Sequence, residues 1–281
     1  MKYKKQFFII IAIIFLIPIL IICNAVYCSV HIDKTHYSIK TDKINTDLHF
    51  VFISDLHNKE FGKNNENLVE KIKQENPDFI AVGGDMVIRY FDDDSVMKEL
   101  LTELSEIAPT YCILGNHERN LQDKLDFKAD ITSTGAVLLD NATIRFKKDG
   151  ETVLIGGLTD YPYYEYDAPD YNNDNRYYWD EFKEESKQNF AILLHHQPEY
   201  IKDMVTDSDV DLVLCGHTHG GLIRIPFVGG LFAPNQGFFP TYDKGEFKFG
   251  GTTMIISSGL GISNPIPRIN DCAEIAVIDV N

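Results

Sequence analysis

"TDLHFVFISDLHN", residues 46–58, joins an apolar run of strand length to the polar pair Asp55 and His57. The run predicts a buried strand that ends where this polar pair begins. The tripeptide Asp-Leu-His also precedes the run, at Asp47–His49. The even offset between the two copies would place both on the same side of an extended strand, so only their positions at opposite ends distinguish them. We expect the second copy to belong to a site, because other polar residues gather at the same end of the predicted sheet.

Strand-length and helix-length segments alternate along the first half of the chain. Apolar runs at residues 78–84 and 110–115 follow the opening strand. The amphipathic patterns that predict helices cover residues 64–76, 95–107 and 118–131. Shorter predicted strands follow at residues 142–146, 152–157, 190–196, 210–216, 252–259 and 273–280. A β-α-β-α-β order predicts an α/β fold, in which helices cover a sheet with parallel strands.

Potential metal ligands follow five of the predicted strands. In chain order they are Asp55 and His57, then Asp85, then Asn116, His117 and Glu118, then His195 and His196, and finally His217 and His219. In open α/β sheets, ligands bind where the carboxyl ends of the strands meet, so these side chains are expected to share one crevice. His195 and His196 are adjacent in a strand and point to opposite faces, so at most one of them faces the crevice.

This combination of Asp, His and Asn suits a pair of divalent metal ions. A carboxylate can bridge two ions, while imidazoles and an amide oxygen complete ligand shells of mixed nitrogen and oxygen. Two ions about 3.5–4 Å apart can activate a water molecule and neutralise the charge of a phosphoryl group. The sequence therefore indicates hydrolysis of a phosphoester.

The order of these motifs resembles the signature of the calcineurin-like metallophosphoesterases. The matching residues are Asp55-x-His57, Gly84-Asp85, Gly115-Asn116-His117-Glu118, His196 and Gly216-His217-x-His219. The resemblance runs from about residue 48 to the C-terminus. Together with the apolar N-terminus, the motif GHTHGG and the stretch from Gly259 to Glu274 resemble the membrane-associated bacterial branch of the family. The resemblance implies a four-layer α/β/β/α sandwich with a two-metal centre.

The resemblance also implies a role for each residue. One ion would be held by Asp55, His57 and His219, the other by Asn116, His196 and His217, with Asp85 bridging the two. His117 would contact the phosphate and protonate the leaving oxygen. His196 is preferred to His195 because the family histidine stands two residues before a proline, here Pro198. Such shells accept Mn, Fe, Zn or Co as the divalent ions.

The expected activity is that of a phosphodiesterase or pyrophosphatase acting on a lipid-linked or cell-envelope phosphoester. One alternative is a phosphomonoesterase of the protein phosphatase kind, for which Arg89 stands at a matching position. Ile88, Asn58 and Leu114 depart from that pattern. The other alternative is a non-catalytic scaffold on the same fold. Such scaffolds usually lack some ligands, whereas every expected ligand is present here.

The N-terminal segment is apolar from residue 7 to residue 28 and follows three lysines. A helix of this length spans about 33 Å, which is enough to cross a bilayer. It predicts an uncleaved single-pass anchor in the cell membrane, and a cleavable signal peptide is the alternative. The basic N-terminus favours a cytoplasmic N-terminus with the catalytic domain outside, although Lys34, Lys40 and Lys43 reduce the asymmetry.

The predicted organisation is a tail and anchor over residues 1–28, a linker or first edge element over 29–46, and a catalytic domain over 47–281. The net charge of the chain is −16, and the three lysines of residues 1–28 leave −19 for the remainder. This charge argues against nucleic acid as a partner, because its binding requires a basic face.

Two further features of the sequence carry weaker expectations. The five cysteines do not suggest a disulfide framework. The segment 160–185 contains many tyrosines and the single tryptophan, Trp179. We expect it to be a surface excursion whose aromatic side chains pack on the domain, and a lid beside a pocket is the alternative.

Overall fold

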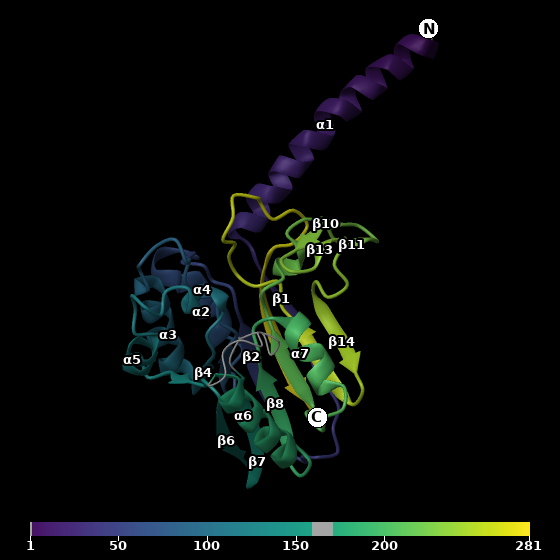
Figure 1. Cartoon of the computed structure of the whole chain (residues 1–281). Coiled ribbons are helices and arrows are strands. Elements are labelled where there is room, and N and C mark those ends of the chain that lie inside the picture. Colours follow the sequence, from purple (N-terminus) through teal and green to yellow (C-terminus); the bar gives the residue numbers. More distant parts are fainter. Residues whose placement is uncertain (1, 159–170) are drawn as a thin grey trace.

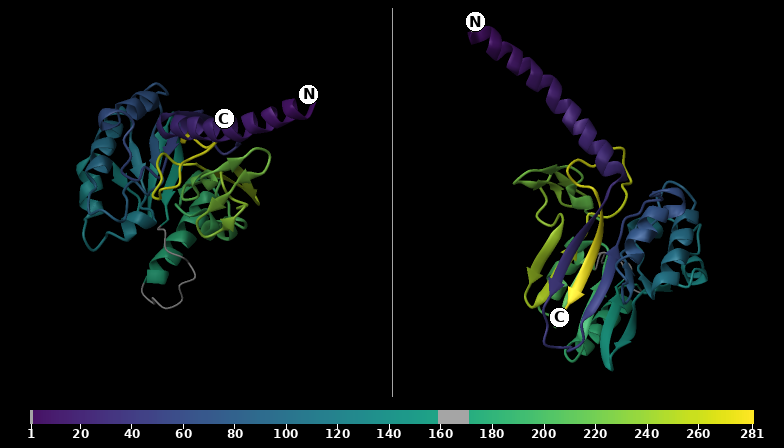
Figure 2. Two further views of the ribbon diagram at one scale, coloured as in Figure 1. Left: turned by 90° about the horizontal axis from the view of Figure 1, so that it is seen from above. Right: turned by 180° about the vertical axis from the view of Figure 1, so that it is seen from behind.

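The computed structural model describes residues 2–158 and 171–281. Within these ranges the side chains of residues 2–5, 7–13 and 171–175 lie outside the description. A long N-terminal helix, α1 (Lys2–Val30), projects from a body in which two sheets pack face to face (Figures 1 and 2).

The first sheet has six strands in the order β1-β16-β2-β3-β4-β5. Their bounds are β1 (Ile32–Ile39), β16 (Ala273–Val280), β2 (Leu48–Ile53), β3 (Ile80–Val82), β4 (Thr110–Cys112) and β5 (Val137–Leu138). Strands β2 to β5 are parallel, whereas β16 is antiparallel to β2 and parallel to β1. The sheet therefore presents the carboxyl ends of β2, β3 and β4 at one edge.

The second sheet has the order β14-β15-β9-β8-β7-β6. Its strands are β14 (Gly245–Phe249), β15 (Thr252–Ile256), β9 (Leu212–Cys215), β8 (Phe190–Leu194), β7 (Glu151–Gly157) and β6 (Ala142–Lys148). Strands β15, β9, β8 and β7 are parallel, and the two outer strands are antiparallel to their neighbours. The mixed α/β fold with parallel strands, as predicted, is confirmed.

Helices cover the outer face of each sheet. On the first sheet they are α2 (Glu66–Lys73), which follows the short helix η1 (Lys63–Asn65), α3 (Ser95–Ile107) and α5 (Phe127–Ser133). On the second sheet they are α6 (Tyr171–Ser186) and α7 (Pro198–Val205). Buried clusters lie in three places: under the first set of helices, between the sheets, and under the second set. The layers thus run helix, sheet, sheet, helix.

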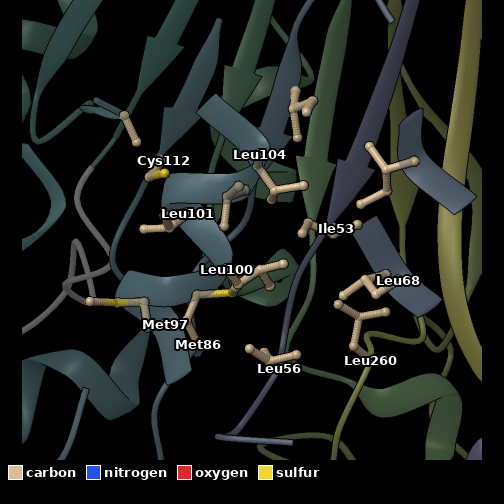
Figure 3. Packing of buried hydrophobic residues seen from close by; sticks show 14 of the residues in the cluster. Ile53, Leu56, Leu68, Met86, Met97, Leu100, Leu101, Leu104, Cys112 and Leu260 are labelled. Carbon is tan, nitrogen blue, oxygen red and sulfur yellow. The ribbon is translucent and has the colours of Figure 1, made fainter. Parts of the chain in front are cut away.

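Successive side chains of strand β2 pack alternately in two of these clusters. Val51 and Ile53 pack with the helices, whereas Phe50 and Phe52 pack between the sheets. Successive strand residues point to opposite faces, so a strand buried on both sides reads as a continuous apolar run. Figure 3 shows the helix-side cluster, in which Ile53 lies near Leu100 and Leu104 of α3.

The structure resolves an open expectation for two stretches and differs from the expectation for a third. The stretch predicted as a linker or first edge element contains strand β1, which is the edge strand of the first sheet, pairs with β16 and buries Ile32 and Ile39. The helix predicted over residues 118–131 is instead the short helix α4 (Asn116–Arg119) and α5, because a turn follows Arg119, in which Lys124 N–H donates to Leu121 O at 2.8 Å. Of the segment 160–185, residues 160–170 lie outside the description, and α6 packs Tyr178 and Trp179 against the second sheet, as expected of its aromatic side chains.

A disulfide joins Cys28, at the end of α1, to Cys272 beside β16. The sequence did not predict it, because 244 positions separate the two cysteines and only the folded chain brings them together. Among the residues whose side chains are described, no helix combines the length and apolar composition needed to cross a membrane. The side chains of residues 7–13, which are part of the predicted anchor, are not among those described.

Candidate metal centre

The predicted ligands follow strands of both sheets and meet at one edge. Asp55 and Asp85 follow β2 and β3, and Asn116 and His117 begin α4 just after β4. His196 follows β8 of the second sheet. The last two, His217 and His219, follow β9, and His219 opens the short helix η2 (His219–Gly221). Parallel strands in the two packed sheets therefore deliver all of these side chains to one place.

Three groups of side chains in this cluster could each hold a metal ion. They are Asp55, His57 and His219; Asp85, His196 and His217; and His57, Asp85 and His117. Within each group the potential ligand atoms lie within 4.8 Å of one another, and all of the residues are buried. Asp85 and His57 each belong to two groups, so neighbouring positions for two ions share these residues.

The two carboxylates occupy the centre of the cluster. Asp85 Oδ2 lies 3.1 Å from His196 Nε2 and 3.9 Å from His57 Nε2. Asp55 Oδ1 lies 3.9 Å from His57 Nε2 and 4.0 Å from His219 Nε2. Asp85 therefore lies beside histidines of different groups, as a bridging carboxylate must, and Asp55 Oδ1 also lies 3.9 Å from His196 Nε2.

Hydrogen bonds to the rings separate the histidines into two kinds. His57 Nδ1 lies 3.2 Å from Val87 O and His196 Nδ1 lies 2.7 Å from Gly83 O. A carbonyl can only accept, so in each ring Nδ1 carries the proton and Nε2 keeps its lone pair. In His117, by contrast, Nδ1 accepts the backbone N–H of Arg89 at 3.1 Å. Its proton is therefore on Nε2, 3.9 Å from Asp85 Oδ2.

Buried atoms without hydrogen-bond partners show that the donor set fits metal ions. Among the described residues, His57 Nε2, His219 Nδ1 and Asn116 Oδ1 are buried and lack a partner. A buried polar atom with no partner is costly and rare in a folded protein. Lone pairs of imidazole and amide groups beside two carboxylates are the donors that a pair of divalent transition-metal ions takes.

Burial determines the protonation of these side chains. It lowers the pKa of His57 and of His217 to about 3, so both imidazoles are neutral at neutral pH. Burial raises the pKa of Asp55 to about 6. Burial alone would also raise the pKa of Asp85, but the neighbouring imidazoles, His196 first, hold it well below its usual value. Asp85 is therefore ionised, as a bridging ligand requires.

Comparison with known proteins identifies the family. Residues 48–221 match the family described as calcineurin-like phosphoesterase. The chain belongs to this family. Phosphodiesterase YaeI of Escherichia coli (strain K12) is 29% identical over 246 residues, which cover 82% of this chain and 81% of that protein. Metallophosphoesterase YkuE of Bacillus subtilis (strain 168) is 28% identical over 215 residues, which cover 75% of this chain and 71% of that protein.

The predicted membership of the metallophosphoesterases, and with it the class of phosphoric ester hydrolase, is thus confirmed. The family uses a pair of divalent metal ions, and this chain contains the groups that could bind them. A solved structure of a phosphopantetheinyl hydrolase from Mycobacterium tuberculosis is 12% identical, has a TM-score of 0.48, and covers 78% of this chain and 92% of its own.

The backbone of this metallophosphoesterase is left-handed at five of the predicted ligands. They are Asp55, His57, Asp85, His217 and His219, with φ between 50° and 70°. Side chains of L-residues disfavour this region, and such residues persist where surrounding contacts over-determine them. Two such contacts are Asp55 N–H to Gly84 O at 2.9 Å and His217 N–H to both carboxylate oxygens of Asp55 at 3.1 Å.

Glu118 supports the site of this metallophosphoesterase in a way that the sequence did not reveal. Its buried carboxylate accepts the backbone N–H groups of Asp85, Met86, Val87 and Gly115 at 2.6–3.1 Å. It thereby joins the loop after β3 to the loop after β4. The motif Gly-Asn-His-Glu drew attention to this residue, but its partners became visible only in the fold.

Gly115 is part of the same junction, because a Cβ there would overlap the carboxylate of Asp85. The absence of a side chain lets the two loops approach closely enough for His117 N–H to bond Asp85 Oδ1 at 2.7 Å. Glycine at this position is therefore required by the close approach of backbone and carboxylate.

Arg268 is a second supporting residue that the sequence did not single out for a role. Its buried guanidinium donates to the carbonyl oxygens of Ser258 and Gly261, both at 2.6 Å. This holds a loop against the first ligand, because Gly261 N–H donates to Asp55 O at 2.6 Å. A buried arginine that binds carbonyls leaves no pattern in the sequence beyond the residue itself.

The structure also separates the ambiguous residues. His196 lies in the cluster, whereas His195 turns away and its Nδ1 lies 3.2 Å from Leu158 O. In the first Asp-Leu-His copy, Asp47 is exposed and His49 Nδ1 lies 2.7 Å from Asp279 Oδ1. That copy stands at the start of β2, away from the carboxyl end that carries Asp55.

Proposed function

We propose that this metallophosphoesterase hydrolyses a phosphodiester or a pyrophosphate, with a lipid-linked or cell-envelope phosphoester as its substrate. The observation that supports it best is the contrast among the histidines. His57 and His196 carry their protons on Nδ1 and so present unprotonated Nε2 atoms to the cluster, whereas His117 presents a proton beside them. This combines metal ligands with a proton donor, as hydrolysis of an ester with a poor leaving group requires.

The proposed ligand sets are those indicated by the sequence. Asp55, His57 and His219 would hold one ion, and Asn116, His196 and His217 the other, with Asp85 shared. When bound, the two ions would supply positive charge to the phosphoryl oxygens and lower the pKa of a water molecule. The acidic domain otherwise offers little positive charge to an anionic substrate.

The residues of the chain perform the remaining tasks. Hydrolysis forms a P–O bond from water and breaks the P–O bond to the leaving group, whose oxygen then needs a proton. His117 Nε2 holds a proton at the cluster, and the Arg89 N–H bonded to Nδ1 keeps it there. Burial lowers the pKa of His117, so the ring is neutral and its single proton is the one on Nε2, which it can donate toward the leaving oxygen.

The positive charge near His117 comes from Arg89, and this arrangement favours a diester over a monoester. The charge of Arg89 acts on His117, and its guanidinium lies over the Tyr90 ring, 5.6 Å from the centroid. A dianionic monoester is usually held by bidentate contacts from arginine. The monophosphatase pattern expects a second arginine before Gly115, where Leu114 stands instead.

His117→Gln tests the proposed proton donor. We expect kcat for a diester with an alkyl leaving group to fall by about 10²–10⁴-fold, the usual contribution of a general acid. Loss should be smaller for bis-p-nitrophenyl phosphate, whose leaving group needs little protonation. The assay uses the purified full chain with Mn²⁺, and metal content is measured in parallel.

His49→Gln is the matched control, because His49 lies outside the cluster at the other end of β2. An equal loss for both leaving groups, or loss of bound metal in His117→Gln, would contradict the assignment. Faster turnover of p-nitrophenyl phosphate than of its diester would favour the phosphomonoesterase. No turnover with any of several divalent metals would favour the scaffold.

We also propose that α1 anchors the chain in the cell membrane with the catalytic domain outside. Support comes from the apolar run of residues 7–28 and from the disulfide between Cys28 and Cys272. Disulfides persist in oxidising compartments and are rare where thiols are kept reduced.

Trapping of free thiols in intact cells tests this location. We expect mass spectrometry of the membrane fraction to recover Cys28 and Cys272 as one cross-linked peptide pair, while buried Cys112 stays a free thiol and serves as the internal control. Recovery of Cys28 and Cys272 as alkylated thiols would argue for a reducing compartment.

A further inference from the structure

A small lobe of the molecule contains a single charged side chain, Arg224. It comprises residues 222–242 and contains β10 (Arg224–Ile225), β11 (Gly229–Gly230), β12 (Phe232–Ala233) and β13 (Gly237–Phe238), and is called the β10–β13 lobe below. From residue 225 to residue 242 it carries no acidic or basic side chain, although the chain as a whole has a net charge of −16. Such a contrast marks this surface as different from the rest of the domain.

The lobe exposes large apolar side chains. Phe227 is fully exposed, and Phe238, Val228 and Phe239 are 71%, 61% and 60% exposed. Ile266, on the neighbouring loop, is 43% exposed. Soluble surfaces rarely gather so many apolar side chains, and contiguous patches of this kind indicate contact with a partner or a membrane.

The interior of the lobe is also apolar and incompletely filled. A cavity of about 270 Å³ lies between the lobe and the loop before β16. It is lined by Leu222, Ile223, Leu231, Phe232, Phe238 and Ile266, together with Gly221. The lobe therefore has an apolar hollow in addition to the apolar side chains on its surface.

Hydrogen bonds connect the lobe to the end of α1. Asn270 N–H donates to Asn24 Oδ1 of α1 at 2.7 Å, and its side-chain amide donates to Arg224 O at 3.2 Å. Arg224 N–H in turn donates to Ile269 O at 2.9 Å. Figures 1 and 2 show the lobe beside the C-terminal end of α1 in each view.

The C-terminal half of α1 also exposes large apolar side chains. Those more than half exposed include Leu20, Ile22, Val26, Tyr27 and Val30. The lobe and α1 thus both expose apolar side chains, and both lie at the same end of the domain (Figure 1).

The lobe is also joined directly to the metal centre. Leu222 N–H donates to His219 O at 2.8 Å, and the side-chain amide of Asn235 lies 3.2 Å from His217 Nε2. A partner or membrane that covers the lobe is therefore held next to the ligand cluster.

We propose that the β10–β13 lobe docks on the surface of a lipid bilayer, with Phe227, Phe238 and Phe239 inserted among the acyl chains. Aromatic side chains suit the boundary between headgroups and acyl chains. A second copy of this chain fits less well, because two domains of strong negative charge repel each other. Docking would hold the metal centre at the membrane surface, within reach of a phosphoester in a lipid headgroup.

A tryptophan placed on the lobe tests this proposal. The full chain carrying Phe227→Trp is reconstituted in vesicles of dioleoylphosphatidylcholine that contain a dibrominated analogue, whose bromine quenches tryptophan within the acyl-chain region. Tyr177→Trp is the matched control, because Tyr177 is 74% exposed on α6, at a distance from α1 (Figure 1). Buried Trp179 contributes the same background to both proteins.

We expect the added emission of Phe227→Trp to be quenched severalfold more than that of Tyr177→Trp, and to shift to shorter wavelength on reconstitution. Equal quenching of the two proteins would overturn docking by the lobe, as would failure of the chain to float with the vesicles. Quenching of neither protein together with cross-linked dimers would assign the lobe to self-association. The fluorescence measurement requires no turnover, so its result is independent of whether the proposed hydrolysis is correct.

Discussion

Asp85→Asn is expected to abolish most of the hydrolytic activity, with a fall of at least about 10²–10³-fold, the scale of losing one preorganised electrostatic group. Asparagine keeps the shape of the side chain and an oxygen for His117 N–H, so the fold is preserved. It loses the negative charge and one of two ligand oxygens. Asp85 belongs to two of the three groups that could hold a metal, so we expect both ions to bind more weakly.

Metal content by mass spectrometry and turnover of a diester measure the two effects. Asp55→Asn should weaken the binding of one ion more than that of the other, because Asp55 belongs to only one of the three groups. Asp47→Asn is the matched control, since it alters the same residue in the first Asp-Leu-His copy, where the side chain is exposed. A loss of metal in Asp47→Asn comparable to that in Asp55→Asn would overturn the choice between the copies.

Glu118→Ala is expected to lower the free energy of unfolding by several kcal/mol. Four backbone N–H groups lose their acceptor, and each buried donor left without one costs about 1–3 kcal/mol. The loops after β3 and β4 would separate, which moves Asp85 away from Asn116. Activity should therefore fall as well, although Glu118 itself belongs to none of the groups that could hold a metal.

Denaturant unfolding of the metal-free chain measures the change in the free energy of unfolding. Because no metal is bound, this change reports the lost hydrogen bonds between the loops and not a loss of metal. Glu118→Gln should be intermediate, because its amide oxygen still accepts while its NH₂ faces backbone donors. Glu103→Ala is the control, since Glu103 is exposed on α3. An unfolding free energy for Glu118→Ala within 0.5 kcal/mol of that of Glu103→Ala, the usual range for surface changes, would contradict the role.

The sequence alone determined the residues that meet at the site. Ligand residues directly follow apolar runs, and a strand that is buried on both faces must end where such polar side chains begin. In parallel strands those ends share one edge, so His57, Asp85 and His217 could be placed together without coordinates. Local pattern sufficed because each ligand stands within a few residues of its own strand.

Tertiary structure decided what depends on contacts between distant segments. The partners of Glu118, the loop held by Arg268 and the disulfide from Cys28 to Cys272 join residues that no local pattern relates. Strand β1 is another case, because its half-polar sequence forms a strand only by pairing with β16. The proton on His117 Nε2 was likewise decided by Arg89 N–H from another loop, because the position of an imidazole proton depends on the partner that each nitrogen meets.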